Sequence, residues 1–300
     1  MMNREKTVLV SGATGLIGSA LCARLRELGY SVRALSRSRG DVSWDPNAGT
    51  MEDGALEGVD AVVHLAGEPV TQRWTSGARQ RIMDSRVRST QILVDAILAQ
   101  AQPPAYVAAS GVNFYGYHCD GWVDESAPSG DGFLAEVCRA WEGAAQPLEV
   151  AGVRSVFVRT GVVLSASGGA LAKMLPVFKL GLGGRIGFGT QLMSWIALPD
   201  LVEVYVRVIV DATATGPINA VAPKPATNNE FTEALGRVLG RPTVFSVPRI
   251  GVKTMFGEMG KETVMANIGV KPMVLQRMGF EWKLPDLEVA LTQCVGNNDK

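Results

Sequence analysis

The stretch TVLVSGATGLIGSALCARLRELG, residues 7–29, decides the fold. Its first four residues, Thr7–Val10, form a β-branched, apolar run that predicts a strand. Ile17–Leu28 then carries apolar residues at helical spacing and stops at Gly29. We therefore expect a strand, a glycine-rich turn and a helix in direct succession at the start of the chain.

The same alternation of strands and helices continues through the first half of the chain. Further strands are expected at Ser31–Leu35, Ala61–Leu65, Ala105–Ala109 and Ser155–Arg159, and helices at Val87–Ala99 and Glu136–Ala151. Each strand is a nearly continuous apolar run, which is typical of a parallel sheet covered on both faces. Because crossovers between parallel strands are right-handed, the simplest topology is an α/β fold with a doubly wound parallel sheet of the Rossmann type.

The character of the sequence changes beyond about residue 165. Glycine-rich loops occupy 168–171 and 180–189, and a helix is expected near Asp200–Asp211. We expect a dinucleotide-binding Rossmann domain over residues 1–165, with later sheet strands contributed by about 190–222. Residues 166–300 are expected to form mainly a smaller C-terminal substrate lobe, interleaved with that domain.

Composition limits the classes of partner. Lys plus Arg and Asp plus Glu both number 29, and no stripe of Lys and Arg could follow a phosphate backbone, so nucleic acid is not expected as a partner. No apolar stretch reaches membrane-spanning length and the N-terminus shows no signal-peptide pattern, so we expect no membrane and no export. The cysteines are scattered without a paired spacing, which argues against zinc or disulfides and favours reduced thiols in a cytoplasm. They are Cys22, Cys119, Cys138 and Cys294.

The turn Gly12-Ala13-Thr14-Gly15-Leu16-Ile17-Gly18 predicts a dinucleotide site. Between a first strand and a first helix, a pyrophosphate meets unpaired backbone N–H groups and the positive end of the helix dipole. Gly12 permits the tight turn, Gly15 lets the backbone approach the phosphates, and Gly18 lets the helix pack closely on the sheet. An ordinary glycine-rich turn is the alternative, and the position of the pattern in an alternating β/α chain disfavours it.

The end of the second expected strand favours NADP(H) over NAD. NAD binders usually place an Asp or Glu there to hold the ribose 2′-hydroxyl, whereas this chain reads Ser36-Arg37-Ser38-Arg39. Arg37 can pair with a 2′-phosphate through its planar fork, and Ser36 can donate a hydroxyl hydrogen bond. The alternative is that these arginines form a solvated turn.

With GATGLIG at 12–18, VVHLAG at 62–67 and FYG at 114–116 in order, the chain resembles the extended short-chain dehydrogenase/reductase superfamily, in its epimerase/dehydratase branch. More narrowly, it is similar to the "epimerase family protein" group, which has its own C-terminal domain. The shared segments include HLAGEPV at 64–70, VRTGVVLSASGGAL at 158–171, MLPVFKLGLGGRIGFGTQLMSWI at 174–196 and MGFEWKLPDLEVAL at 278–291. The resemblance covers nearly the whole chain.

The resemblance implies a set of NADP(H) contacts at the matching positions. Gly12, Thr14, Gly15, Leu16 and Ile17 would hold the pyrophosphate, Ser36 and Arg37 the 2′-phosphate, and Leu65, Ala66 and Gly67 would flank the adenosine ribose. Glu68, Arg81 and Arg86 fall where this group contacts or closes over the cofactor, and Val163 lies near the nicotinamide end.

The chain departs from the superfamily at the usual proton relay, a Tyr followed four residues later by a Lys that lowers the phenol pKa. None of the five tyrosines has a Lys four residues later, and alignment on the usual helix places Leu134 and Cys138 at the two positions. Ser110 lies near the superfamily's catalytic Ser/Thr, one residue out of register. Tyr115, beside Phe114, is the best replacement acid, so Ser110 and Tyr115 are the candidate catalytic residues.

Three other polar residues invite a chemical role. His64 ends an apolar strand, where packing and hydrogen bonding beside the cofactor are favoured over proton transfer. His118 is expected in a loop, with a solvated side chain as the simpler reading. Arg159 closes an apolar strand and should pair with a carboxylate or with cofactor, because a buried charge without a partner is unstable.

Two functions remain open from the sequence. One is an NADP(H)-dependent oxidoreductase or epimerase acting on an unknown small substrate, carbonyl or nucleotide-linked. The other is a cofactor-binding sensor or interaction protein that has lost catalysis, since a fold alone does not imply activity. Division inhibition by protein binding has little support. Monomer and homodimer are both compatible with the resemblance.

Overall fold

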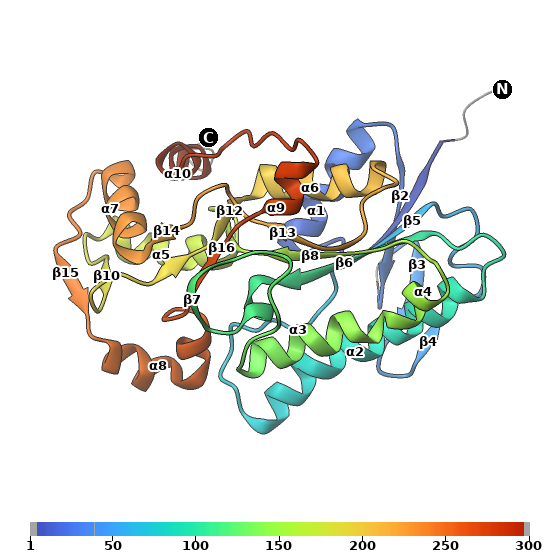
Figure 1. The fold of residues 1–300 in the computed structure, drawn as a ribbon, viewed down its shortest axis with the longest axis horizontal. Helices are drawn as coiled ribbons and strands as arrows, with labels where there is room; N and C mark the ends of the chain where they lie inside the picture. The colour runs from blue at the N-terminus through green and yellow to red at the C-terminus, as the bar shows by residue number, and fades with distance from the viewer. Residues whose placement is uncertain (1–4, 39, 297–300) are drawn as a thin grey trace.

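The computed structural model describes residues 5–38 and 40–296, and an eight-stranded sheet runs through its centre (Figure 1). Arg39, in the turn after the second expected strand, lies outside the described residues. In order across the sheet, the strands are β13 (Gly216–Ala220), β8 (Ser155–Thr160), β6 (Ala105–Gly111), β5 (Ala61–His64), β1 (Thr7–Ser11), β2 (Ser31–Ser36), β3 (Val42–Asp45) and β4 (Thr50–Met51). All neighbours are parallel except β3 and β4 at the edge, which confirms the expected α/β fold.

Helices cover both faces of the sheet, as in a doubly wound fold (Figure 1). One face packs against α1 (Leu16–Glu27), α6 (Leu198–Val210) and α9 (Met273–Arg277). The other face packs against α2 (Ser76–Leu98), α3 (Phe133–Ala144) and α4 (Gln146–Val150). The central strands are buried on both sides, which is why their sequences read as continuous apolar runs.

Two of the expected helices have different bounds in the structure. The helix expected over Val87–Ala99 begins at Ser76, because the Thr75 side chain accepts a hydrogen bond from Ala78 N at 3.2 Å and caps a polar first turn. The helix expected over Glu136–Ala151 is two helices, broken at Ala145. Pro147 explains the break, since it has no N–H to continue the hydrogen-bond ladder.

Strand β3 was not expected from the sequence. Its four residues alternate between buried and exposed, too short a run to stand out from a loop.

The remaining elements form a second body of structure at one end of the sheet (Figure 1). Its strands pair as β14 (Ala226–Thr227), β11 (Leu192–Met193), β16 (Asn267–Val270) and β7 (His118–Val123), then β9 (Val162–Leu164) with β12 (Trp195–Ala197), and β10 (Gly184–Ile186) with β15 (Phe245–Val247). Its helices are α5 (Gly169–Lys179), α7 (Asn228–Leu239), α8 (Arg249–Glu262) and α10 (Leu287–Gly296), and η1 (Val112–Tyr115) is a short 3₁₀ turn after β6.

The expected interleaving of the two parts takes a specific form. Of the segment 190–222, only β13 joins the large sheet, whereas β11 and β12 pair within the second body. A domain boundary at residue 165 stays a prediction. Within the described part of the chain, no helix has the length and apolar character needed to cross a bilayer.

Candidate functional site

The turn between β1 and α1 is built around three glycines. Gly12 has a φ of 71°, and a Cβ there would lie 2.9 Å from both Leu65 C and Ala66 N. A Cβ on Gly18 would lie 2.2 Å from Gly12 O, so α1 can pack this closely only with glycine. Gly12 therefore permits the tight turn and Gly18 permits the close packing of α1, as expected from the sequence.

Gly15 differs from the other two glycines because its Cβ position is less crowded. Its one close neighbour would be Gly12 O at 3.3 Å, and its φ of −75° is available to any residue. Thr14 and Gly15 are exposed, while Leu16 and Ile17 are partly buried. Gly15 precedes α1 without a side-chain cap, and the first turn of α1 contains no acid. The helix therefore presents its N-terminal N–H groups to an anion.

The end of β2 lies beside this turn, since Ser11 pairs with Leu35 across the two parallel strands. Ser36 is partly buried and accepts a hydrogen bond from Ser38 N at 3.4 Å. Arg37 is exposed and has neither an ion pair nor a side-chain hydrogen bond within the described residues. Asp41 is an acid in the same turn, but its carboxylate accepts Ala34 N at 2.7 Å. The turn thus leaves a free guanidinium next to the glycines.

His64 lies between the ends of β1 and β5 and the helix α2. Its Nδ1 is 2.6 Å from Ser11 Oγ and its Nε2 is 2.9 Å from Ser89 Oγ, with the ring fully buried. Ser11 Oγ already accepts the N–H groups of Leu65 and Ala66, so its own proton goes to Nδ1 and His64 carries its proton on Nε2.

Burial lowers the pKa of His64 to about 3, so the ring is neutral at physiological pH. The expected packing and hydrogen-bonding role is therefore confirmed.

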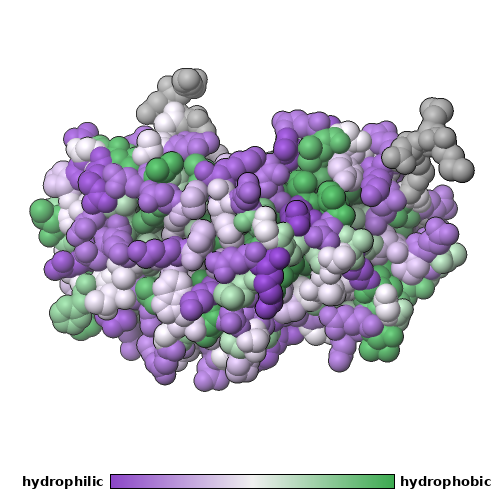
Figure 2. Space-filling view, turned by 45° about the horizontal axis from the view of Figure 1, so that its top comes forward, coloured by the Kyte–Doolittle hydropathy of each residue, from purple (hydrophilic) through white to green (hydrophobic). Residues whose placement is uncertain are grey.

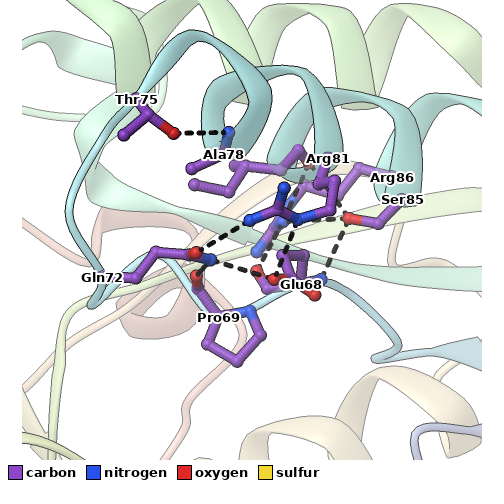
Figure 3. Close-up of polar contacts among 9 residues, drawn as sticks. Glu68, Pro69, Gln72, Thr75, Ala78, Arg81, Ser85 and Arg86 are labelled. Atoms are coloured by element: carbon purple, nitrogen blue, oxygen red, sulfur yellow. Dashed lines mark hydrogen bonds and ion pairs between the residues drawn. The ribbon is translucent and has the colours of Figure 1, made fainter.

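The segment after β5 is held by Arg86 of α2 (Figure 3). Arg86 Nη1 donates to Glu68 O at 3.0 Å and to Ile82 O at 3.1 Å, and the guanidinium lies 4.9 Å from the centre of the Trp141 ring. A Cβ on Gly67 would lie 3.0 Å from Arg86 Cζ, so glycine at this position leaves space for the arginine side chain.

Burial lowers the pKa of Arg86, and no carboxylate of the described residues pairs with it. Its guanidinium lies beside Gly67, and the nearby charge of Glu68 partly offsets the effect of burial.

A weaker cluster flanks the same segment at the surface (Figure 3). Gln72 Nε2 donates to Glu68 Oε1 at 3.0 Å, and Arg81 Nε lies 3.7 Å from the same oxygen. The Arg81 side chain is 61% exposed, so this ion pair contributes little to stability. Arg81 Nη2 also donates to Gln72 Oε1 at 3.4 Å, so the structure brings Glu68, Arg81 and Arg86 together.

Three polar residues lie in register across the carboxyl ends of β6, β8 and β13. Ser110 pairs with Arg159, and Arg159 pairs with Asn219. Ser110 Oγ donates to Glu142 Oε1 at 2.7 Å, and Arg159 donates to both oxygens of that carboxylate. The predicted partner of Arg159 is thus a carboxylate, Glu142 of α3.

Tyr115 belongs to the same network. Its hydroxyl donates to Asn219 Oδ1 at 2.8 Å and accepts from Arg159 Nη1 at 3.0 Å, and the residue is buried. Burial raises the pKa of Tyr115, while the charge of Arg159 acts in the opposite direction. Both candidate catalytic residues, Ser110 and Tyr115, are therefore joined through Arg159, and both hydroxyls are engaged within the protein.

The two positions of the usual Tyr and Lys hold buried residues that cannot form that pair. Leu134 and Cys138 are buried on α3, and Cys138 Sγ lies 3.8 Å from Gly111 O. Burial raises the pKa of the Cys138 thiol. Neither residue can replace the proton relay.

Two further predicted residues have clear places. Val163, in β9, pairs with Ile196 of β12 and is partly buried. His118 was expected in a loop but begins strand β7, which pairs with β16, and its exposed ring lies 3.3 Å from Asp120 Oδ1. The expectation of a loop was wrong, although that of a solvated side chain holds.

Sequence reasoning missed Glu142 and Asn219. Glu142 lies on one stripe of α3 with Leu134 and Cys138, four and eight residues apart, and an acid on a largely apolar stripe is a signal that could have been used. No sequence pattern marks Asn219 as a site residue, because its hydrogen-bond partners come from distant parts of the chain.

Taken together, the geometry defines a class: a Rossmann-type protein with a dinucleotide site at the carboxyl edge of its sheet. Comparison with known proteins gives the family. The chain belongs to the NAD dependent epimerase/dehydratase family, which it matches over residues 8–220. Residues 247–294 match a domain of unknown function, DUF1731. These matches confirm the resemblance inferred from the sequence motifs.

Relatives align along nearly all of the chain. The epimerase family protein Mb2239 of Mycobacterium bovis is 41% identical over 280 residues, 92% of this chain and 93% of that protein. The crystal structure of human epimerase family protein SDR39U1 (isoform 2) with NADPH has a TM-score of 0.88 at 35% identity, covering 97% of this chain and 99% of the human one. The nucleoside-diphosphate sugar epimerase from Corynebacterium glutamicum has a TM-score of 0.82 at 36% identity, covering 98% of this chain and 59% of that one.

Proposed function

We propose that this protein binds NADP(H) and is an oxidoreductase or epimerase acting on a small carbonyl or nucleotide-linked substrate. The observation that carries the cofactor is Arg37, whose exposed guanidinium has no partner among the described residues and follows the strand next to the glycine turn. Asp41 is an acid of the same turn, and its carboxylate is held at the backbone by accepting Ala34 N. The NADPH in the structure of the human relative supports the same choice.

The residues that would hold NADP(H) fit the group. Gly15 has the least crowded Cβ position of the three glycines and lies beside the uncapped start of α1, and Arg86 places a second positive charge at Gly67. Thr14, Leu16 and Ile17 complete the turn, while Leu65, Ala66 and Glu68 follow β5, and Val163 follows β8. Arg81, on an exposed side chain, would close over the site.

When bound, NADP(H) supplies or accepts a hydride at its nicotinamide ring. The protein must then move a proton, and Ser110 and Tyr115 are the residues we propose for it. The charge of Arg159 favours the phenolate of Tyr115, as the lysine does in the usual pair, although burial outweighs it and the pKa is raised. Glu142 holds both Arg159 and Ser110 in place.

A catalytically degenerate NADP(H) sensor is the second candidate. The observation that favours it is the closed hydrogen bonding of Tyr115, whose hydroxyl has a partner both as donor and as acceptor. Leu134 and Cys138 offer no replacement. A cytoplasmic location, and a monomer or homodimer, fit either candidate.

The cofactor is tested by titrating the protein with NADPH and NADH and following the quench of its tryptophans. The wild type should bind NADPH far more tightly than NADH, and Arg37→Ala should lose most of that difference. Arg33→Ala is the matched control, because Arg33 lies in β2, just before Arg37, and donates to Glu57 O. Equal affinity for both dinucleotides, unchanged in Arg37→Ala, would exclude the NADP(H) assignment.

Catalysis is tested separately with a panel of carbonyl substrates. Oxidation of NADPH that falls by about 10²-fold or more in Tyr115→Phe, with NADPH affinity retained, supports the enzyme. Binding without turnover on any substrate supports the sensor.

A further inference from the structure

Two segments of the second body contain basic residues and no acid. They are 177–190, which includes the end of α5 and β10, and 240–257, which includes β15 and most of α8. Their five cations are Lys179, Arg185, Arg241, Arg249 and Lys253. In a chain with equal numbers of acidic and basic residues, this is a local excess of positive charge.

The fold brings the two segments together at one end of the molecule (Figure 1). Strands β10 and β15 pair in parallel, with Arg185 opposite Ser246. A Cβ on Gly181 would lie 3.8 Å from Pro242, and one on Gly187 would lie 3.0 Å from Arg249. The segments therefore form one surface, which we call the basic–apolar face. None of its five cations has an ion-pair partner in the described part of the chain.

The same face exposes large apolar side chains. They are Phe188 (88% exposed), Val244 (82%), Ile250 (79%), Met255 (76%), Leu180 (74%), Leu182 (56%), Phe245 (51%), Val177 (48%), Phe256 (40%) and Val247 (37%). Figure 2 shows hydrophobic residues at the outer margin of this end of the molecule, among hydrophilic ones. Exposed apolar groups gathered to this extent mark a binding surface.

The charge of the basic–apolar face distinguishes between the partners that could bind to it. A second copy of the chain, docked through the same face, would bring five cations against five cations with no acid between them. A nucleic acid would suit the charge, but seven of the ten exposed apolar side chains are aliphatic and offer no platform for base stacking. Aliphatic groups beside Lys and Arg match a surface with an apolar interior and a negatively charged outer layer.

We propose that the basic–apolar face binds peripherally to a membrane surface that contains anionic lipids. The aliphatic and phenylalanine side chains enter the boundary between headgroups and acyl chains, and the five cations lie against the headgroup phosphates. The expectation of no membrane partner rested on the lack of membrane-spanning stretches, which peripheral binding does not need. This face joins two segments whose nearest residues, 190 and 240, are fifty positions apart, so it exists only in the folded chain.

The proposal is tested by co-sedimentation of the full chain with vesicles. Vesicles of phosphatidylcholine alone are compared with vesicles of equal parts phosphatidylcholine and phosphatidylglycerol. The wild type should sediment with the anionic vesicles and remain in solution with the neutral ones. Raising the salt concentration should weaken this binding.

Two variants locate the binding. Arg249→Gln with Lys253→Gln should lower the partition coefficient by about 25-fold, since each basic residue contributes about fivefold near an anionic surface. Phe188→Ser with Ile250→Ser should lower it while keeping the charge. Arg26→Gln with Lys224→Gln is the matched control, because both residues are exposed and lie outside the face. Thermal unfolding and NADPH titration of each variant show whether it has folded.

Several results would overturn the proposal. Equal binding to neutral and anionic vesicles, no binding to either, or loss of binding in the control variant alone would each do so. So would a gel shift with RNA, or a concentration-dependent dimer, that is abolished by Arg249→Gln with Lys253→Gln when vesicles are not bound. The NADPH titration is independent of these outcomes, so failure here leaves the proposed cofactor untouched.

Discussion

Arg159 of β8 and Glu142 of α3 share two hydrogen bonds, 2.9 Å from Nε to Oε1 and 2.7 Å from Nη2 to Oε2. The side chains are only 5% and 12% exposed. The guanidinium carbon also lies 3.4 Å from the centre of the Phe114 ring. Because little water reaches either group, each charge depends on the other for compensation.

Glu142→Gln should therefore destabilise the protein strongly. The substitution leaves Arg159 charged and buried without a carboxylate, a change that lowers the free energy of unfolding by about 3–5 kcal/mol. Urea unfolding measures the effect. Glu149→Gln, at an exposed acid of α4, should change it by less than about 0.5 kcal/mol. Equal, small effects in both variants would mean that the buried pair is not required.

His64 should make stability depend on pH. Its pKa is about 3 in the folded protein and about 6.5 in the unfolded chain, so the unfolded chain takes up the proton first as the pH falls. Stability from this group is complete above about pH 6.5 and declines toward pH 3, by about 2 kcal/mol between pH 7 and pH 5.

The two histidines of the chain provide the test of this pH dependence. Urea unfolding at pH 7 and pH 5 should show a smaller loss in His64→Gln than in the wild type. The exposed His118 is the control, and His118→Gln should lose as much as the wild type. An undiminished loss in His64→Gln would show that other groups govern the acid sensitivity.

Glu262 should stabilise the start of α3. Its two oxygens accept Phe133 N at 3.0 Å and Leu134 N at 2.9 Å, and the residue is buried. Glu262→Ala leaves both N–H groups without an acceptor and should lower the free energy of unfolding by about 1–3 kcal/mol. Glu262→Gln keeps one oxygen and should lose less.

Hydrogen exchange in the first turn of α3 reports on the same contact, because the amides of Phe133 and Leu134 should exchange faster in Glu262→Ala. Glu136→Ala is the control, since Glu136 is an exposed acid of that turn. Unchanged exchange in Glu262→Ala would mean that water replaces the carboxylate without loss.

Gly15 and Gly18 should respond differently to the same substitution. Gly15→Ala requires only a small shift of Gly12 O and should change the melting temperature little, yet weaken NADPH binding by tenfold or more, because the methyl group occupies the phosphate approach. Gly18→Ala forces α1 away from Gly12 O and should cost about 1–3 kcal/mol of stability. Tight NADPH binding by Gly15→Ala would place the phosphates elsewhere.

Local patterns in the sequence were sufficient to predict the parallel sheet and the glycine-rich turn after its first strand. The strand before Gly12 and the helix after it follow from neighbours in the chain, as do the buried strands β5, β6 and β8. The helix over Ser76–Leu98 was shortened in the prediction, because its start rests on the Thr75 cap rather than on apolar spacing.

Contacts between distant residues could not be predicted. Glu142 meets Ser110 and Arg159 only because α3 packs beside the ends of β6 and β8, and the pairing of Tyr115 with Asn219 spans 104 residues. The basic–apolar face has the same origin, in the pairing of β10 with β15. The sequence predicted that Arg159 pairs with a carboxylate or with cofactor, but only the fold shows that Glu142 is its partner.

The contact of Glu262 with Phe133 also bears on how the protein is made. The acceptor for the first turn of α3 lies 129 residues further along the chain, so that turn leaves the ribosome long before its partner exists. Until Glu262 is added, these two N–H groups lack their carboxylate acceptor, and the first turn of α3 is less stable. The start of this helix therefore reaches its full stability only late in synthesis.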